Sequence, residues 1–247
     1  MGNQFCYKKK NLEPPICEEE KLIPPHYEEV KDEEFPNSYQ LMKNELANYF
    51  EETDEFLKKL KDNNGLMAGS FPLSVMLKRL GLESFEANDI DIFVEKKDAV
   101  HIHSYLETID YRETGRLKSK SYTGDDIYTV KEYEKYGKIV QVVSTNIKPL
   151  GSVRRFDLGC CGTYFDNKGG IVVRDPGIFK KHTMLYLGNM KTNSMERIEK
   201  YIQRGFKIYY DKIDITWHCK RLIKDDTDMG DFKIFIREYT RLIKVQY

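Results

Sequence analysis

The stretch Met67-Ala68-Gly69-Ser70, together with Asp89-Ile90-Asp91-Ile92 further along the chain, decides which fold the sequence predicts. The apolar run from Gly65 to Gly69 indicates a short buried strand. Ser70 is a preferred residue type at a helix N-cap, so a helix is predicted to begin there. Acidic and apolar residues alternate from Asp89 to Val94, which indicates a second strand.

Asp89 and Asp91 are separated by a single residue on the second predicted strand. Side chains at positions i and i+2 leave the same face of a strand, with Cα atoms roughly 7 Å apart. Two carboxylates on one face offer the oxygen ligands that Mg²⁺ prefers, and Mg²⁺ often shares its shell with substrate phosphates. A surface strand with solvated acidic residues shows the same alternation. The pair alone therefore does not decide between a metal site and a solvated face.

Gly69 and Ser70 lie where the predicted strand meets the N-terminus of the predicted helix. The first N–H groups of a helix have no partner within it, and the helix dipole favours negative charge at that end. Glycine lets the backbone approach a phosphate closely, and the Ser70 hydroxyl adds a donor. The turn is therefore a candidate phosphate site, although an ordinary strand–helix connection has the same composition.

Taken together, the Gly-Ser turn and the Asp-x-Asp strand resemble the nucleotidyltransferase superfamily that includes the polymerase-β-like enzymes. The resemblance implies a third carboxylate on a later strand of the sheet. Asp157 is the candidate, and Asp166 is its rival, although the Asn-Lys-Gly-Gly that follows Asp166 favours a turn. Eighteen residues separate Ser70 from Asp89, which is more than the family usually places there.

The resemblance also implies an activity and a role for each site residue. It indicates an enzyme that moves a nucleoside monophosphate from an NTP to an acceptor hydroxyl. Asp89, Asp91 and Asp157 would bind Mg²⁺ or Mn²⁺, and Gly69 and Ser70 would hold the β- and γ-phosphates. The acceptor stays open among an RNA end, a small molecule and a protein side chain.

Two further stretches, Phe156–Cys161 and Arg197–Phe206, look similar to uncharacterised superfamily members from large DNA viruses. The resemblance covers roughly residues 40–206. Cys160 and Cys161 lie within the first stretch, and core packing is the better explanation for both thiols.

The remaining predicted elements define the fold class. In chain order they are a helix over 37–62 capped by Asn37, a helix over 99–109, a hairpin of strands 127–133 and 138–145 around Gly137, strands over 155–164 and 170–173, and helices over 195–204 and 231–245. This order predicts an α+β fold: a nucleotidyltransferase-like mixed β-sheet with helices packed on one side. We expect a flexible tail at 1–36, the core at 37–175 and a mostly helical extension at 176–247.

The predicted tail is rich in proline and acidic residues, so it is expected to be disordered. Pro24, Pro25 and Tyr27 match the PPxY peptide that WW domains bind. Gly2 loosely resembles an N-myristoylation site, but Cys6 replaces the usual Ser or Thr, which argues against membrane association. The alternative to an enzyme is a non-catalytic interaction protein on the same fold, recruited through this tail.

Composition sets the broad class of the protein. The 247 residues are 40% hydrophobic and 32% charged, as in a globular chain with a charged surface. No apolar run approaches the ~20 residues of a membrane span, and the N-terminus lacks a secretory signal. We therefore expect a cytoplasmic location, in the host cytoplasm or the virion if the protein is viral. The five scattered cysteines do not suggest a disulfide framework.

Charge is distributed unevenly along the chain. Residues 1–62 hold 9 Lys/Arg and 15 Asp/Glu residues, whereas the remainder holds 31 and 25. The mildly basic body suits a nucleotide or another polyanion.

Overall fold

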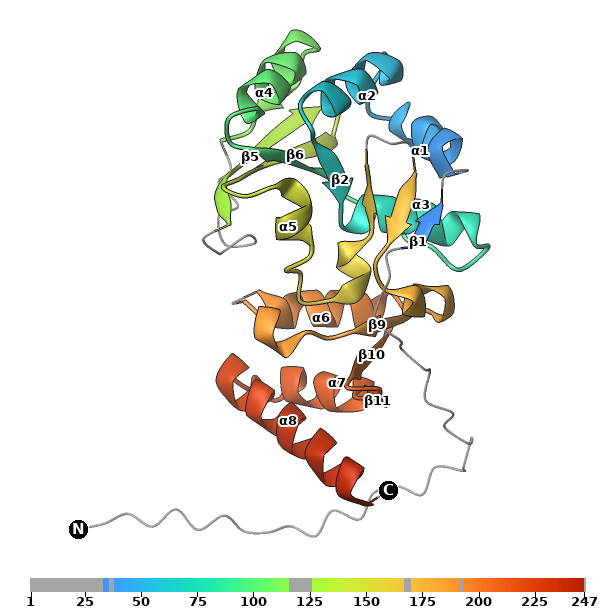
Figure 1. The fold of residues 1–247 in the computed structure, drawn as a ribbon, viewed down its shortest axis with the longest axis vertical. Coiled ribbons are helices and arrows are strands. Elements are labelled where there is room, and N and C mark those ends of the chain that lie inside the picture. The colour runs from blue at the N-terminus through green and yellow to red at the C-terminus, as the bar shows by residue number, and fades with distance from the viewer. Residues whose placement is uncertain (1–32, 36–37, 116–125, 167–169, 192, 247) are drawn as a thin grey trace, which may run out of the picture.

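The computed structural model describes residues 33–35, 38–115, 126–166, 170–191 and 193–246 (Figure 1). The WW-binding peptide predicted at Pro24, Pro25 and Tyr27 and the acylation site predicted at Gly2 lie outside the described residues. Within the predicted tail, strand β1 (Glu33–Phe35) is described, and it pairs with β8 (Ile171–Val173). The tail predicted to extend to residue 36 thus contributes a strand to the sheet.

The described part of the core is built around an eight-stranded sheet in the order β1-β8-β7-β2-β3-β6-β5-β4. β3 and β6 run parallel and the other neighbouring pairs run antiparallel, so the sheet is mixed. The predicted strands at 65–69, 89–94 and 170–173 and the predicted hairpin are confirmed. The bounds of the other strands are β2 (Leu66–Ala68), β3 (Asp89–Glu95), β4 (Arg112–Glu113), β5 (Ile127–Lys135), β6 (Lys138–Thr145) and β7 (Tyr164–Phe165).

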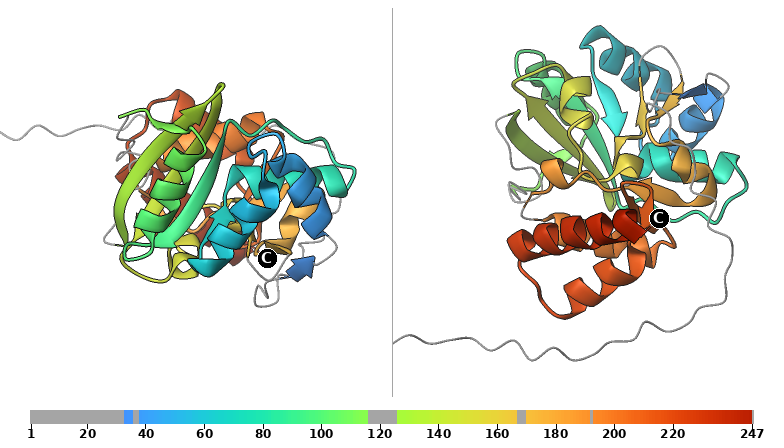
Figure 2. Two further views of the ribbon diagram at one scale, coloured as in Figure 1. Left: turned by 90° about the horizontal axis from the view of Figure 1, so that it is seen from above. Right: turned by 60° about the horizontal axis from the view of Figure 1, so that its bottom comes forward.

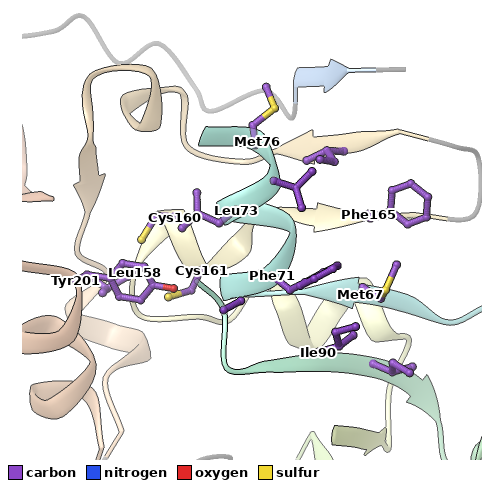
Figure 3. Packing of buried hydrophobic residues seen from close by; sticks show 14 of the residues in the cluster. Met67, Phe71, Leu73, Met76, Ile90, Leu158, Cys160, Cys161, Phe165 and Tyr201 are labelled. Carbon is purple, nitrogen blue, oxygen red and sulfur yellow. The ribbon is translucent and has the colours of Figure 1, made fainter. Parts of the chain in front are cut away.

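Four helices pack against one face of this sheet because alternate strand residues on that face are apolar. Ile90, Ile92 and Val94 of β3 are fully buried there, with Val140 and Val142 of β6, in the main core. Figure 3 shows Ile90 in this core together with Met67, Phe71 and Leu73. Each helix contributes buried side chains to the same core. The four helices are α1 (Tyr39–Leu46), α2 (Thr53–Asp62), α3 (Ser70–Arg79) and α4 (Ala99–Thr108).

The opposite face of the sheet is divided between an apolar part and a polar part. Phe93 and Val143 belong to a smaller apolar cluster, which the short helix α5 (Pro149–Val153) helps to cover. Asp89 and Asp91 share this face with Phe93, because residues two apart on a strand point the same way. The predicted α+β class, a mixed sheet with helices packed on one side, is confirmed. Asp89 and Asp91 lie on the face of the sheet opposite to the main helical layer.

The single helix predicted over 37–62 is wrong, because α1 and α2 are separated by a turn at 47–52. Phe50, in this turn, is 1% exposed and stacks on Phe56 with 3.8 Å between ring centroids. Residues six apart in a continuous helix point to different sides, so the break allows both rings to enter the core. The Tyr111 hydroxyl also donates to the Tyr49 carbonyl at 2.8 Å. The predicted cap Asn37 lies outside the described residues, and Ser38 precedes α1.

The strand predicted over 155–164 is also wrong. The chain forms a short 3₁₀ helix, η2 (Gly159–Gly162), before it enters β7. A Cβ atom on Gly159 would collide with the Asp175 side chain, and one on Gly162 would lie 3.0 Å from Arg174 Cδ. The chain turns tightly against these neighbours, and the turn buries Cys160 and Cys161 in the main core. Their predicted packing role is confirmed, although a strand does not provide it.

The C-terminal part combines three helices with a small sheet, and it lies below the core in Figure 1. The predicted helices at 195–204 and 231–245 are confirmed, whereas the sequence pattern did not indicate α7 or the sheet. Figure 2 shows α7 and α8 next to each other, outside the main sheet. No helix in the described ranges is both long and apolar enough to cross a membrane. The elements are η3 (Pro176–Lys180), β9 (His182–Met184), η4 (Leu187–Asn189), α6 (Ser194–Gln203), β10 (Lys207–Tyr210), β11 (Ile213–Asp214), α7 (Thr216–Lys224) and α8 (Met229–Gln246).

Candidate active site

A cleft of about 240 Å³ lies between the polar part of the sheet and helix α6. Strands β3 and β6 supply one wall, the turn before α3 lies at the same wall, and α6 supplies the facing wall. Four of the five predicted site residues line this cleft, namely Gly69, Ser70, Asp89 and Asp91. The predicted phosphate turn and the predicted Asp-x-Asp strand are therefore brought together by the fold.

The sheet wall places three polar side chains of β3 and β6 side by side. Asp91 is opposite Gln141 in the parallel register of the two strands. Gln141 Nε2 donates to Asp89 Oδ2 at 3.1 Å and to Glu132 Oε2, on β5, at 3.2 Å. Gln141 and Glu132 are each 2% exposed, so this buried network holds the Asp89 carboxylate in place from the side of β5 and β6. Sequence reasoning missed both residues, although each lies in a strand that it predicted.

The Gly69-Ser70 turn has a conformation that requires glycine. Gly69 has φ of +89° and ψ of −138°, a combination that L-residues rarely adopt. A Cβ atom there would also lie 3.3 Å from Asp91 Oδ2, so glycine leaves space beside that carboxylate. The Gly69 N–H donates to the Thr163 carbonyl at 3.1 Å. The Gly69 N–H is therefore not available to a ligand, and the donors that remain at this turn belong to Ser70 and Phe71.

Ser70 occupies a different helix position from the one predicted. Gly69 is the N-cap residue, and Ser70 is the first residue of α3, with no side-chain capping hydrogen bond at this helix end. The first N–H groups of a helix have no partner within it, and the helix dipole favours an anion at this end. The Ser70 hydroxyl is thus not used as a cap, and it lines the cleft.

Helix α6 brings cationic groups to the facing wall. Arg197 and Lys200 line the cleft together with Glu196, since positions three and four apart share one helix face. Loss of hydration and the neighbouring Arg204 lower the pKa of Lys200, whereas the carboxylates of Asp89 and Asp91 act in the opposite direction. Both aspartates are therefore close enough to Lys200 to act on its charge. The cleft has one acidic wall, and α6 places two cations and Glu196 on the facing wall.

Asp157 does not line the cleft. Its side chain is fully buried, and Oδ1 accepts a hydrogen bond from Arg197 Nη1 at 2.6 Å and one from the Leu158 N–H at 2.9 Å. The tight turn at Gly159 places Asp157 in a loop, and the carboxylate faces α6 instead of β3. Asp157 therefore lies beside the cleft, next to Phe156 and in contact with Arg197, and both of these residues line it.

The rival candidate, Asp166, follows β7, and its N–H donates to the Gly170 carbonyl at 3.4 Å.

Helix α6 could not be assigned to the cleft from its own sequence. The stretch Arg197–Phe206 was singled out by resemblance alone, and its charged residues are as typical of a solvated helix face. Arg154 and Arg155, which are close to Asp157 in the sequence, do not line the cleft. The cleft brings together residues of β3 and α6 that are about a hundred positions apart in the sequence, and local sequence patterns do not predict such an arrangement.

The sheet wall has the chemistry of a divalent-cation site. Asp89 and Asp91 supply hard oxygen ligands on one face, and the missing side chain of Gly69 leaves room beside Asp91. No group of three or more His, Cys, Asp or Glu side chains within the described residues is arranged to hold a metal. Mg²⁺ is commonly held by one or two carboxylates, with substrate phosphates and waters completing its shell. The two carboxylates beside the Gly69-Ser70 turn therefore fit this ion.

Solved structures share the fold at low sequence identity. A CCA-adding enzyme in complex with CTP matches with a TM-score of 0.51 and 14% identity, over 76% of this chain and 46% of its own. A complex with ATP gives 0.49 and 12%, over 75% and 45%. The Thermotoga maritima CCA-adding enzyme complexed with tRNA gives 0.46 and 16%, over 69% and 42%. The chain thus spans less than half the length of these enzymes.

The first of these matches shows a nucleotidyltransferase-like fold for this chain. No protein-family model matches the sequence, and no curated protein matches it.

Proposed function

We propose that the chain is a metal-dependent nucleotidyltransferase, which moves a nucleoside monophosphate from an NTP to a hydroxyl acceptor. The observation that carries the proposal is the composition of the cleft: Asp89 and Asp91 on one wall face Arg197 and Lys200 on the other, with Ser70 at the turn. A triphosphate with its divalent cation presents both signs of charge, and this arrangement complements both. The nucleotidyltransferase-like fold supports the same activity.

The reaction forms one bond to the α-phosphorus and breaks another. The acceptor oxygen attacks the α-phosphorus, the bond to the bridging oxygen of the β-phosphate breaks, and pyrophosphate leaves, while the acceptor proton passes to solvent. Mg²⁺ or Mn²⁺ held by Asp89 and Asp91 would supply positive charge to the phosphates and lower the pKa of the acceptor hydroxyl. Ser70 and the α3 N-terminus would hold the terminal phosphates.

The cationic wall would neutralise charge that develops on the leaving pyrophosphate. Lys200 offers a mobile point charge, and Arg197 offers a planar set of donors. We assign Asp157 a positioning role in place of the predicted metal-binding one, because its contact with Arg197 at 2.6 Å fixes the guanidinium. Most of the catalysis would then come from positioning and charge neutralisation.

A transfer assay tests the proposal. The full chain is incubated with each of the four NTPs, labelled at the α-phosphate, with Mg²⁺ or Mn²⁺ and total cellular RNA as the acceptor probe. Label is expected in the RNA or in the protein, together with free pyrophosphate. The Asp89→Asn/Asp91→Asn variant should lose activity by on the order of 100-fold or more.

Glu95→Gln is the matched control, because Glu95 lies on the same face of β3 but does not line the cleft. Equal transfer by the double variant and the parent would contradict the proposal. Nucleotide binding with no label in any product would favour the alternative, a non-catalytic interaction protein on this fold.

A further inference from the structure

The outer surface of α7 and α8 carries a row of aromatic rings away from the cleft. Trp217 of α7 is 59% exposed, and Phe235 of α8 is 37% exposed. The His218 ring lies between them, with centroids 4.9 Å from Trp217 and 5.4 Å from Phe235. Tyr239 continues the row, nearly parallel to Phe235 at 6.2 Å. We call these four residues the aromatic row, and none of them lines the cleft.

Core packing does not require the exposed rings. α7 and α8 contribute Cys219, Phe232 and Ile236 to the main core, and all three are fully buried. Trp217 and Phe235 lie on other sides of the same helices, and the apolar side chains of Ile234 and Leu242 are 56% and 64% exposed nearby on α8. Exposed apolar surface of this kind marks a binding site more often than chance.

Cationic side chains accompany the aromatic row. α7 and α8 together hold seven Lys/Arg residues and two Asp/Glu residues. The Arg221 guanidinium lies over the Trp217 ring at 5.6 Å from its centroid. The other exposed cations are Lys220, Lys224, Arg237, Arg241 and Lys244.

Acidic residues in the loop between the two helices are engaged locally. Asp225 lies 3.7 Å from Arg221, one turn away, and Asp228 accepts hydrogen bonds from the Gly230 and Asp231 N–H groups at the start of α8. Residues 216–246 together hold seven Lys/Arg and five Asp/Glu residues, and Lys244 pairs with Asp211. The surface of the two helices and their loop therefore keeps a small excess of positive charge.

Aromatic rings next to Arg and Lys side chains are the combination that binds single-stranded nucleic acid, because bases stack on the rings and phosphates pair with the cations. A purely apolar partner would explain the exposed rings but would leave the cations without a counter-charge. We propose that this face binds a single-stranded polynucleotide, with bases stacked on Trp217 and Phe235. Phosphates would lie near Lys220, Arg221 and Lys224, which share one face of α7 with Trp217.

The aromatic row is separate from the proposed transferase site. Binding of a polynucleotide there would identify the class of acceptor on which the proposed transferase acts. The proposed contacts use bases and phosphates, which RNA and DNA share. If both proposals hold, the acceptor is a nucleic acid strand that α7 and α8 hold. Failure of either proposal leaves the other standing, because no residue belongs to both sites.

Trp217 is the single tryptophan of the chain, so its fluorescence reports directly on this face. The full chain is titrated with a labelled 16-nucleotide oligo(U) RNA and with the corresponding oligo(dT) DNA, and both Trp emission and oligonucleotide anisotropy are recorded. We expect quenching of Trp217 with binding that weakens steeply from 50 to 200 mM salt, since phosphate contacts release counterions. The two oligonucleotides distinguish a preference for RNA from one for DNA.

Variants separate stacking from charge. Phe235→Ala should weaken binding about tenfold, because stacking on an aromatic ring contributes about 1–3 kcal/mol per base. Lys220→Gln/Lys224→Gln replaces exposed charges beside Trp217, so it should fold normally, and it should reduce the salt dependence. Tyr128→Ala is the matched control: Tyr128 is 54% exposed with Lys96 3.6 Å from its ring centroid, on β5, and its loss should leave binding unchanged.

Several results would overturn the proposal. The first is absence of binding to both oligonucleotides at protein concentrations on the order of 10 µM in 50 mM salt. The second is binding that the Phe235 variant and the double Lys variant leave unaltered. The third is quenching of Trp217 by self-association or by anionic vesicles alone. Asp89→Asn/Asp91→Asn should bind the oligonucleotides as the parent does, which keeps this test independent of the transferase site.

Discussion

The two faces of strand β3 differ in chemistry although their residues alternate along the same seven positions. Ile90, Ile92 and Val94 are fully buried beneath the helical layer. Asp89 and Asp91 point the other way and line the cleft. Neighbouring side chains on a strand leave opposite faces, so one strand can hold the core together and present the site. Substitutions one residue apart should therefore separate stability from nucleotide binding.

Ile92→Ala should have the largest effect on stability. Ile92 is fully buried in the main core, so the truncation leaves a cavity and should cost about 3 kcal/mol of unfolding free energy. Chemical denaturation measures this cost. Under native conditions the folded variant should still bind NTP with the affinity of the parent. Asp91→Asn should do the reverse: its stability should change by less than about 1 kcal/mol, and it should lose NTP binding. A comparable loss of stability in both variants would contradict the proposed difference between the two faces.

Gly69→Ala should affect both properties at once, because Gly69 joins the core strand β2 to the site. Its backbone conformation would cost an alanine about 2 kcal/mol, and the new methyl group would lie against Asp91. Gly81→Ala is the control, since Gly81 also has positive φ but a Cβ atom there meets nothing within 4 Å. Both variants should lose stability in thermal denaturation, and Gly69→Ala alone should lose NTP binding. Normal binding by Gly69→Ala would place the nucleotide elsewhere.

Lys200 should make nucleotide binding dependent on pH. Loss of hydration lowers the pKa of its ammonium group, so Lys200 loses its charge at a lower pH than an exposed lysine does. Affinity for NTP should fall as the pH rises through this lowered pKa. Stability should change in the opposite sense over the same range, because the unfolded chain binds the proton more tightly there.

Calorimetric titrations across pH measure this effect, and Lys200→Met should weaken binding about tenfold at neutral pH. Lys200→Arg keeps the charge, so it should bind NTP with little change as the pH rises. An equally steep pH profile for Lys200→Arg would assign the titration to another group.

Ser70→Ala should give the smallest effect and the cleanest one. Ser70 is the first residue of α3 and makes no capping hydrogen bond, so alanine should change stability by less than about 0.5 kcal/mol. Loss of a hydroxyl that contacts phosphate should weaken NTP binding by about 1 kcal/mol, roughly fivefold. Isothermal titration measures the change. Unaltered affinity would mean that the α3 N-terminus, not the hydroxyl, supplies the contact.

Local sequence patterns predicted the sheet wall of the site but not the helix wall. The alternation over Asp89–Val94 and the Gly-Ser pair before a helix are recorded within a few residues, and both are confirmed by β3 and α3. Arg197 and Lys200 reach the cleft only because α6 packs across it, and the sequence of that helix does not indicate which element lies opposite its charged residues. The helix wall of the cleft depends on long-range packing, which local sequence patterns do not predict.

The strand predicted over 155–164 was wrong for a different reason. Apolar residues beside Asp157 suggested a strand, but Gly159 packs so closely against Asp175 that the chain must turn. The carboxylate then faces Arg197. The helix predicted over 37–62 failed in a similar way, because burial of Phe50 on Phe56 outweighed the continuous helical periodicity. In both cases tertiary contacts overrode a pattern that was locally consistent.

The most direct test of the central claim is the thermal shift that an NTP with Mg²⁺ or Mn²⁺ produces in the parent chain and in two variants. A ligand present at about 100 times its Kd stabilises the native state by about 2.7 kcal/mol, which corresponds to roughly 5 °C or more for a chain of this size. The parent and Glu95→Gln should show this shift, and Asp89→Asn/Asp91→Asn should show none. An equal shift in the double variant would contradict the claim that the polar face of β3 binds the metal and its nucleotide.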